Sequence, residues 1–198
     1  PPRRADGRGP GLGVAVSGLV ALTGADGFLG SNVARALLRS GYRIRAALEP
    51  GRDTGTLDGL DIEEARGSLL DPGFRASLVD GVDAVIHTAA STAVWPSRMP
   101  SMRSLNVDAA VGLARAAASA GATRYVHVGS ASSFAWGGKE APGDETGPYG
   151  SARFGLDYLD TKREAQEALL SLDRGTMRLV VCAPTFMFGP YDSKPSSG

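Results

Sequence analysis

The sequence predicts an α/β fold in which a doubly wound parallel sheet of the Rossmann type carries helices on both faces. Three observations predict it. Apolar strand-like runs alternate with amphipathic helix-like runs along most of the 198 residues, which is the pattern of βαβ units. A glycine-rich turn joins the first strand to the first helix. Long loops at 89–100 and 133–149 follow later strands, where open α/β sheets bind ligands.

The elements follow in order from these patterns. Six short strands are expected at 19–23, 43–48, 62–65, 84–87, 124–129 and 177–182, most of them rich in apolar or β-branched residues. Helices are expected between them near 28–40, 74–79, 101–120 and 150–172. Gly41 and Gly121 follow the first and third helices as C-terminal stops, and the alanine-rich end of the third is strongly helix-forming.

Length and composition indicate one domain. With 42% hydrophobic and 21% charged residues, the chain can bury a substantial core. We expect residues 1–17, rich in Pro, Gly and Arg, to be a flexible leader, and residues 18–198 to form a dinucleotide-binding domain that also holds the catalytic residues. Arg3, Arg4 and Arg8 precede an uncharged run that imitates a signal peptide. That run is glycine-rich and too short for a comfortable membrane span, so no membrane association is expected.

Charge and cysteine content exclude several functions. Lys+Arg and Asp+Glu are equal at 21 each, without a dense basic cluster, so no nucleic-acid partner is expected. The only cysteine, Cys182, cannot form an intramolecular disulfide, and its valine neighbours favour a place in the strand core. A reducing, cytoplasmic location follows as the expectation. His87 and His127 are expected to be packed, hydrogen-bonded strand residues, and no metal site is expected.

The glycine turn predicts a dinucleotide site. Gly24, Gly27 and Gly30 punctuate the passage from strand to helix, where absent side chains allow a tight turn and close approach of backbone N–H groups to a pyrophosphate. Phe28 and Leu29 begin the helix, whose amino terminus favours negative charge. We therefore expect these five residues to contact the cofactor.

An acidic residue suggests which cofactor binds. Glu49 ends the second strand about twenty residues after Gly30, where a carboxylate can accept hydrogen bonds from both adenosine ribose hydroxyls and would repel a 2′-phosphate. Arg52 lies close enough to pair with such a phosphate instead. The sequence therefore predicts NAD and leaves NADP open, with an ordinary solvated loop acid as the alternative reading of Glu49.

A tyrosine and a lysine predict acid–base chemistry. Tyr158 and Lys162 lie four residues apart on an expected helix and therefore share a face. Lowering the phenol pKa from about 10 by about 3 units requires about 4 kcal/mol of preferential phenolate stabilisation. One cation at about 4 Å supplies roughly that amount at an effective dielectric constant of about 20. Lys162 could also hydrogen bond the nicotinamide ribose; the alternative is a surface pair with Tyr158 packed on the sheet.

Five segments, taken in order, resemble the extended short-chain dehydrogenase/reductase family, which includes the NAD-dependent epimerases and dehydratases. They are residues 23–30, 83–90, 129–137, 158–162 and 184–190. The nearest branches are the sugar epimerases and the dihydroflavonol-reductase-like and hydroxysteroid-dehydrogenase-like enzymes. The resemblance covers about residues 18–198.

The resemblance implies a catalytic hydroxyl after the fifth strand. It falls on Ser132, with Ser130 and Ser133 as competing choices. Ser132 would hydrogen bond the reacting oxygen while Tyr158 transfers its proton and a hydride passes to or from the nicotinamide. The family also implies that Lys162 is the electrostatic partner of Tyr158.

Further cofactor contacts are implied by the same resemblance. Ala89 and Ala90 would line the cofactor channel, and Pro184 would begin the segment that faces the carboxamide. Asn106 would support the fourth helix in a water-linked proton path, although a plain helix residue is an equal reading.

Two departures from the family pattern limit the transfer. Ser68 stands where relatives often carry an adenine-binding Asp, so adenine recognition would rest on the backbone of Leu69 or on Asp71. The acidic pair of the dehydratase branches is absent after Ser132, where Ser133 and another uncharged residue follow, and sugar dehydration is therefore disfavoured.

The sequence thus predicts an NAD(P)-dependent oxidoreductase that interconverts a secondary alcohol and a ketone. A sugar-nucleotide epimerase is the enzymatic alternative, and a non-catalytic dinucleotide sensor or scaffold is the alternative from another class. The family's C-terminal part, which closes over the substrate, is expected to be missing after the sixth strand. Trp95, Phe134, Trp136 and Met187 suggest a partly apolar substrate. The family also implies a possible homodimer.

Overall fold

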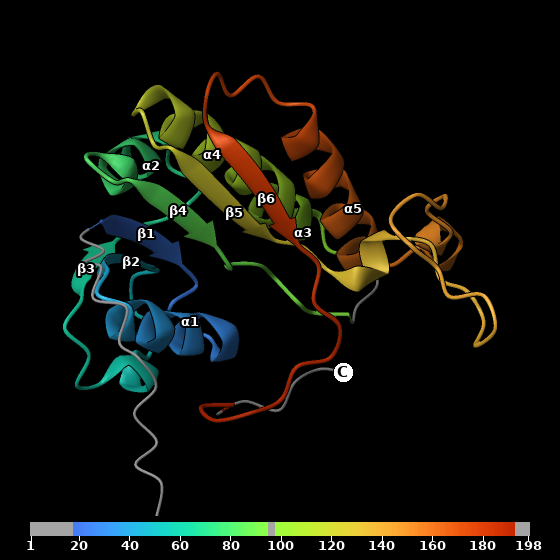
Figure 1. Cartoon of the computed structure of the whole chain (residues 1–198), viewed down its shortest axis with the longest axis horizontal. Helices are drawn as coiled ribbons and strands as arrows, with labels where there is room; N and C mark the ends of the chain where they lie inside the picture. The colour runs from blue at the N-terminus through green and yellow to red at the C-terminus, as the bar shows by residue number, and fades with distance from the viewer. Residues whose placement is uncertain (1–17, 95–97, 193–198) are drawn as a thin grey trace, which may run out of the picture.

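The computed structural model describes residues 18–94 and 98–192, so the predicted leader and Trp95 lie outside the described residues. Six parallel strands form one sheet in the order β3-β2-β1-β4-β5-β6 (Figure 1). The strands are β1 (Leu19–Thr23), β2 (Arg43–Leu48), β3 (Glu63–Arg66), β4 (Ala84–His87), β5 (Arg124–Val128) and β6 (Arg178–Cys182). This is the predicted doubly wound fold, and its strand order reverses between β1 and β4.

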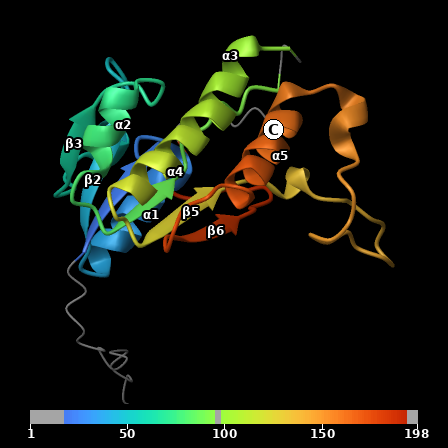
Figure 2. The same cartoon turned by 90° about the horizontal axis from the view of Figure 1, so that it is seen from above.

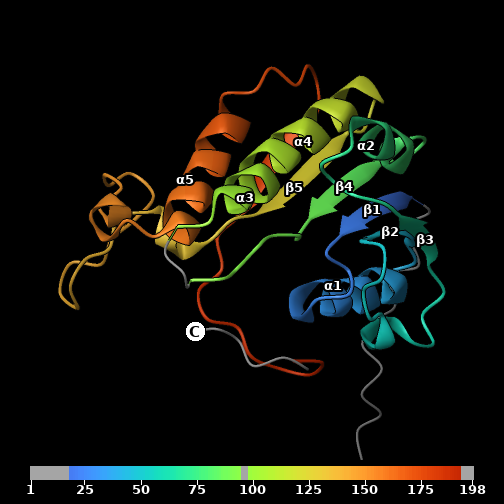
Figure 3. The ribbon, with the colours of Figure 1, turned by 180° about the vertical axis from the view of Figure 1, so that it is seen from behind.

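Helices cover both faces of the sheet. On one face α1 (Phe28–Arg39) packs on β1 and β2, while α2 (Pro72–Val79), α4 (Ala109–Ser119) and α5 (Asp157–Leu170) cover the other (Figures 2 and 3). The shorter pieces are α3 (Pro100–Arg103), the π-helical turn η2 (Ser104–Asp108), and the 3-10 turns η1 (Gly55–Leu57), η3 (Ala131–Ser133) and η4 (Ser151–Phe154). None of the helices in the described ranges is long and apolar enough to cross a membrane.

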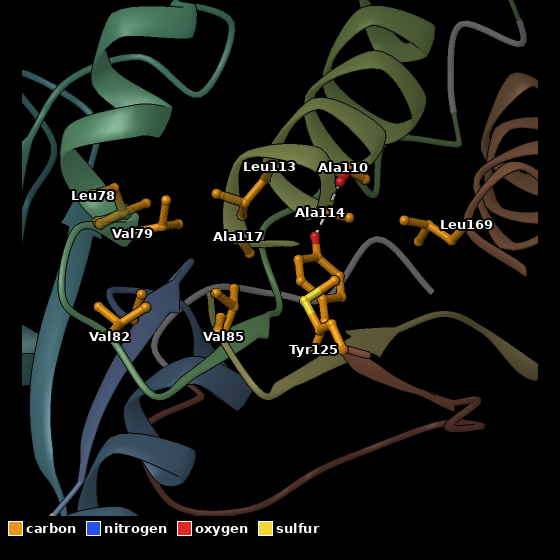
Figure 4. Packing of buried hydrophobic residues seen from close by; sticks show 14 of the residues in the cluster. Leu78, Val79, Val82, Val85, Ala110, Leu113, Ala114, Ala117, Tyr125 and Leu169 are labelled. Atoms are coloured by element: carbon orange, nitrogen blue, oxygen red, sulfur yellow. Dashed lines mark hydrogen bonds between the residues drawn. The ribbon is translucent and has the colours of Figure 1, made fainter. Parts of the chain in front are cut away.

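The core is divided by the sheet. Alternate residues of β1 serve the two sides, because Leu19 and Ala21 join the cluster under α2, α4 and α5, whereas Leu22 joins the cluster under α1. In the larger cluster the Tyr125 hydroxyl reaches α4 and donates a hydrogen bond to the Ala110 carbonyl at 3.1 Å (Figure 4). Burial of these apolar side chains holds the helices against the sheet and so fixes the strand ends.

Cys182 corrects one prediction. It lies in β6 as expected, but it is exposed, as is half of Val180. Both face the side of the sheet that α1 occupies, and α1 packs on β1 and β2, whereas β6 is at the opposite edge. An edge strand that is covered on one face leaves alternate residues in solvent.

Two predicted helices are interrupted. The helix expected at 101–120 is divided into α3, the π turn η2 and α4. The helix expected at 150–172 begins only at Asp157, because Gly155 ends η4 with φ of +58°, a conformation that no right-handed helix can continue through. The Asp157 carboxylate then accepts a hydrogen bond from Met99 N at 2.5 Å and pairs with Arg98 at 2.7 Å, which suits an acidic side chain at a helix amino terminus.

Candidate active site

The glycine turn lies at the carboxyl end of β1, against the loop after β4. Gly24 has φ of +66°, and a Cβ atom there would lie 2.8 Å from the backbone nitrogen of Ala89. A Cβ atom at Gly30 would overlap the Gly24 carbonyl oxygen. Gly27, the residue before α1, has no side chain to cap the helix, and no side-chain hydrogen bond caps the first turn there. This compact turn fits a pyrophosphate.

The loop after β4 is tied directly to that turn through Thr23. The Thr23 hydroxyl accepts a hydrogen bond from Ala89 N at 3.2 Å and lies 2.8 Å from Nδ1 of His87. The Thr88 hydroxyl donates to the Thr23 carbonyl at 2.7 Å. Ala89 and Ala90 are half-buried beside the turn. Sequence analysis missed Thr23, although a polar residue that ends an apolar strand was a usable signal.

Glu49, Leu69 and Asp71 lie after β2 and β3, at the same edge of the sheet. Glu49 is exposed. Leu69 is half-buried against the core, and its carbonyl accepts a hydrogen bond from Arg75 at 2.7 Å. The Asp71 carboxylate accepts from Gly73 N at 2.8 Å and so caps α2. Asp71 is therefore occupied by a structural contact in this conformation.

Lys162 is the most buried charged group of the site. It lies in the second turn of α5, is 4% exposed, and donates from Nζ to the Val128 carbonyl at the end of β5, at 3.1 Å. Burial lowers the pKa of Lys162 from 10.5 to about 8. The lysine therefore remains mainly an ammonium ion at neutral pH. Tyr158 lies one turn earlier on α5 and is half-buried.

The serines after β5 form a 3-10 turn that faces α5. Ser130 Oγ and Ser132 Oγ are 2.8 Å apart, and Ser132 N donates to Ser130 Oγ at 3.3 Å. Ser133 is fully buried, whereas Ser132 is partly exposed. Arg163 of α5 donates to the Ser133 carbonyl at 3.0 Å, which fixes the serine turn against the helix that carries Tyr158.

Asn106 joins three elements. Its carboxamide accepts a hydrogen bond from Ser91 N at 2.8 Å and donates to the Ser91 carbonyl at 3.0 Å and to the Thr161 hydroxyl at 3.1 Å. The π-helical turn places this side chain between the loop after β4 and α5. Asn106 is therefore more than the plain helix residue that remained an alternative: it holds the two sides of the site together.

The segment after β6 returns across the sheet edge to α1 (Figure 1). The Pro184 carbonyl accepts a hydrogen bond from Ala131 N at 3.0 Å, beside the serine turn. Further along, Asn32 of α1 donates to the Pro190 carbonyl at 2.9 Å. Phe186 and Phe188 between these two contacts are 78% and 91% exposed, which leaves apolar surface next to the site.

Two buried histidines lie on neighbouring strands. The rings of His87 and His127 stack with centroids 5.5 Å apart. Burial and the nearby Lys162 charge lower the pKa of His127 to about 3, and burial holds the pKa of His87 well below its usual value. His87 has its predicted hydrogen bond. The prediction for His127 is wrong in one respect: within the described residues neither of its ring nitrogens has a partner.

The parallel strands bring most predicted site residues to one edge. The glycine turn, Glu49, Leu69, Ala89, Ala90, Ser132 and Pro184 each follow a strand's carboxyl end. Lys162 reaches the end of β5 from α5. A phosphate-binding turn at the reversal of strand order defines a Rossmann-type dinucleotide-binding protein.

Comparison with known proteins identifies the family. The model of the NAD dependent epimerase/dehydratase family matches residues 20–198, so the chain belongs to this family of NAD-dependent enzymes. The sequence resemblance is thereby confirmed.

Individual relatives support the same family assignment. The chain is 33% identical over 178 residues to sterol demethylase protein B of Methylococcus capsulatus, covering 88% of this chain and 53% of the relative. It is 31% identical over 188 residues to the 3 beta-hydroxysteroid dehydrogenase/Delta 5-->4-isomerase of Mycobacterium tuberculosis, covering 88% and 48%. A short-chain dehydrogenase/reductase superfamily protein from Agrobacterium tumefaciens, solved with bound NAD, matches with a TM-score of 0.64 and 26% identity over 82% of this chain and 48% of that one. The chain thus spans about half the length of these relatives.

Proposed function

We propose that the protein is an NAD(P)-dependent oxidoreductase that interconverts a secondary alcohol and a ketone. Tyr158 would be the acid or base at the substrate oxygen, Lys162 its electrostatic partner, and Ser132 the donor that orients that oxygen. NAD, when bound, supplies the acceptor or donor of the hydride. Gly24, Gly27, Phe28, Leu29 and Gly30 would hold its pyrophosphate.

Glu49 would accept hydrogen bonds from the adenosine ribose, and the backbone of Leu69 would lie beside the adenine. Ala89 and Ala90 would line the channel toward the nicotinamide, and Pro184 would begin the strip along its carboxamide. Support comes from the placement of these residues at one sheet edge and from the cradle that a side chain at Gly24 would fill.

The buried ammonium of Lys162 carries this proposal. It lies one turn after Tyr158 and is held to β5 by a hydrogen bond of 3.1 Å. An ammonium ion in such a desolvated place stabilises the phenolate that Tyr158 would become on giving up its proton. Tyr158 could therefore take part in proton transfer with the substrate oxygen.

Ser132 is preferred to its neighbours on exposure and contacts. Ser133 is fully buried, so its hydroxyl has no path to a substrate. The hydroxyl of Ser130, also buried, lies 2.8 Å from that of Ser132. Ser130 would therefore accept or donate the second hydrogen bond of Ser132, which leaves Ser132 to meet the substrate oxygen.

The substrate would be a partly apolar alcohol or ketone. One relative is named as a hydroxysteroid dehydrogenase, whose named chemistry is the oxidation of a secondary alcohol. Near the site this chain exposes large apolar side chains, among them Phe186, Phe188 and the stacked pair Trp136 and Phe154. Such surface favours a ligand with a large apolar part.

Tyr158→Phe tests the proposal, with Tyr42→Phe as the matched control at the opposite end of the sheet. Substrate-dependent NADH formation is measured over a panel of secondary alcohols that includes 3β-hydroxysteroids, and NADH binding is measured by fluorescence. Tyr158→Phe should lose at least about 100-fold in turnover because it lacks the transferable proton, while NADH affinity stays unchanged. Equal turnover in the wild-type protein and Tyr158→Phe would refute the assignment.

Other outcomes of the assay point to the alternatives. Inversion of a sugar nucleotide without net NADH formation would support an epimerase, which uses the same hydride chemistry twice. NADH binding without turnover on any substrate would support a dinucleotide sensor or scaffold. We also propose that the protein forms a homodimer paired through α4 and α5, which light scattering tests. The single cysteine is consistent with a cytoplasmic location, which is the last part of the proposal.

A further inference from the structure

Three charged residues lie at or near the glycine turn, at the end of the proposed dinucleotide site that would hold the adenosine. Asp26 lies inside the glycine turn, and Glu49 and Arg52 stand at the two ends of the turn that follows β2. Arg52 N donates to the Glu49 carbonyl at 3.3 Å, and Gly51 between them has φ of +79°. This tight turn folds Arg52 back toward the glycine turn.

The arginine is already paired. Its Nε lies 3.1 Å from Oδ2 of Asp26, whose side chain is only 9% exposed, whereas that of Arg52 is 49% exposed. The Asp26 backbone is fixed as well, because the Thr56 hydroxyl donates to its carbonyl at 2.9 Å. Among the residues that the structure describes, Arg52 is the charge partner of this carboxylate.

A second cation near the glycine turn, Arg35, is also engaged. Arg35 donates to the Thr56 carbonyl at 2.7 Å and to the Ser31 carbonyl at 3.0 Å, and its guanidinium stacks on the Tyr191 ring at 3.6 Å. With Arg35 held in this way, Arg52 is the cation best placed to meet a phosphate on the adenosine ribose.

We propose that the Asp26–Arg52 ion pair makes this protein select NAD over NADP, an inference that rests on the dinucleotide site proposed above. A 2′-phosphate could use Arg52 only by breaking the pair, which would leave the nearly buried Asp26 carboxylate unpaired beside a second anion. The ribose hydroxyls of NAD need only an acceptor, which Glu49 provides. Arg52 also neutralises a carboxylate that would otherwise repel the pyrophosphate at the glycine turn.

The test is Asp26→Asn, with Asp58→Asn as the matched control. Asp58 is an exposed carboxylate in the connection between β2 and β3 that also holds Arg52, so its change adds the same net charge without touching the pair. NADH and NADPH are titrated by fluorescence, which needs no substrate. Asp26→Asn frees Arg52, so NADPH should bind about tenfold more tightly, as one charge-assisted hydrogen bond allows, while NADH affinity changes less than about threefold. Asp58→Asn should leave the ratio of the two affinities unchanged.

A second variant keeps the inference testable if Asp26→Asn is poorly folded. Arg52→Gln should weaken NADH binding, because it leaves Asp26 unpaired at the pyrophosphate turn, and should give no gain for NADPH. The double variant Asp26→Asn with Arg52→Gln should lose the NADPH gain. An unchanged affinity ratio in Asp26→Asn, or an equal gain in Asp58→Asn, would overturn the inference. If the wild-type protein binds neither NADH nor NADPH, the proposed dinucleotide site itself is wrong. The titration of the wild-type protein alone shows this outcome.

Discussion

Replacing Lys162 by methionine should make the folded protein more stable at neutral pH while removing the proposed electrostatic partner of Tyr158. The ammonium is 4% exposed, and burial lowers its pKa from 10.5 to about 8. At 1.36 kcal/mol per pH unit, that displacement corresponds to a penalty of about 3 kcal/mol for keeping the charge in the fold. Methionine also removes the hydrogen bond to the Val128 carbonyl, worth about 1 kcal/mol. The expected net gain is about 2 kcal/mol.

The stability difference between the wild-type protein and Lys162→Met should depend on pH, and the direction of the pKa change determines its sign. Because the folded-state pKa lies below the unfolded value, the unfolded chain binds the extra proton between about pH 8 and 10.5, and the stability of the wild-type protein relative to Lys162→Met rises through that window. Below pH 8 the penalty is fully present. Near pH 10.5 it is gone, and the wild-type protein should become the more stable by about 1 kcal/mol, the worth of its hydrogen bond.

Urea unfolding of both proteins, without dinucleotide, at several pH values from 7 to 10.5 measures the difference. Taking the difference between the two proteins cancels the titration of all other groups. If Lys162→Met were less stable than the wild-type protein at pH 7, or if the difference did not vary with pH, the lysine would not be a desolvated cation and its electrostatic role would fail.

Two further substitutions test the architecture of the site. Gly24→Ala places a Cβ atom 2.8 Å from the loop after β4 at a positive φ, so it should abolish NADH binding and lower the melting temperature. The control is Gly59→Ala, because Gly59 also has a positive φ, of +75°, but a Cβ atom there would have nothing within 4 Å. This control should lower the unfolding free energy by only about 1 kcal/mol and leave NADH binding intact. Asn106→Ala removes three hydrogen bonds of a buried carboxamide and should lower the unfolding free energy by about 3 kcal/mol in urea titrations. Asn32→Ala, at a half-buried residue of α1, should cost only about 1 kcal/mol. Equal losses would contradict the conclusion that Asn106 holds the two sides of the site together.

The sequence predicted the strands and their order along the chain well, because most strands are short, apolar runs followed by a turn signal; β3, with three charged residues of four, is the exception. The sequence also predicted the edge at which the candidate site lies, since parallel strands must end together. The sequence did not predict the interruptions in two of the helices. The late start of α5 and the wide turn around Asn106 come with contacts to residues elsewhere along the chain: Met99 N donates to the Asp157 carboxylate, and Ser91 N donates to the Asn106 carboxamide.

The contacts among charged and polar site residues were harder still to foresee. The sequence indicated Arg52 as a residue that could pair with a 2′-phosphate, but nothing in the sequence pairs it with Asp26, which is 26 positions away. The stacking of His87 on His127 likewise requires the register of β4 beside β5. Periodicity reports which face a residue occupies; it does not report which neighbour from another strand lies there.

Hydride transfer itself is the central claim, and isotope transfer tests it most directly. Secondary alcohols deuterated at the carbinol carbon are incubated with NAD and the protein, and the recovered dinucleotide is analysed by mass spectrometry. The account predicts deuterium in the reduced nicotinamide with the wild-type protein and none with Tyr158→Phe. Reduced dinucleotide that carries no deuterium, or the same label with both proteins, would contradict it.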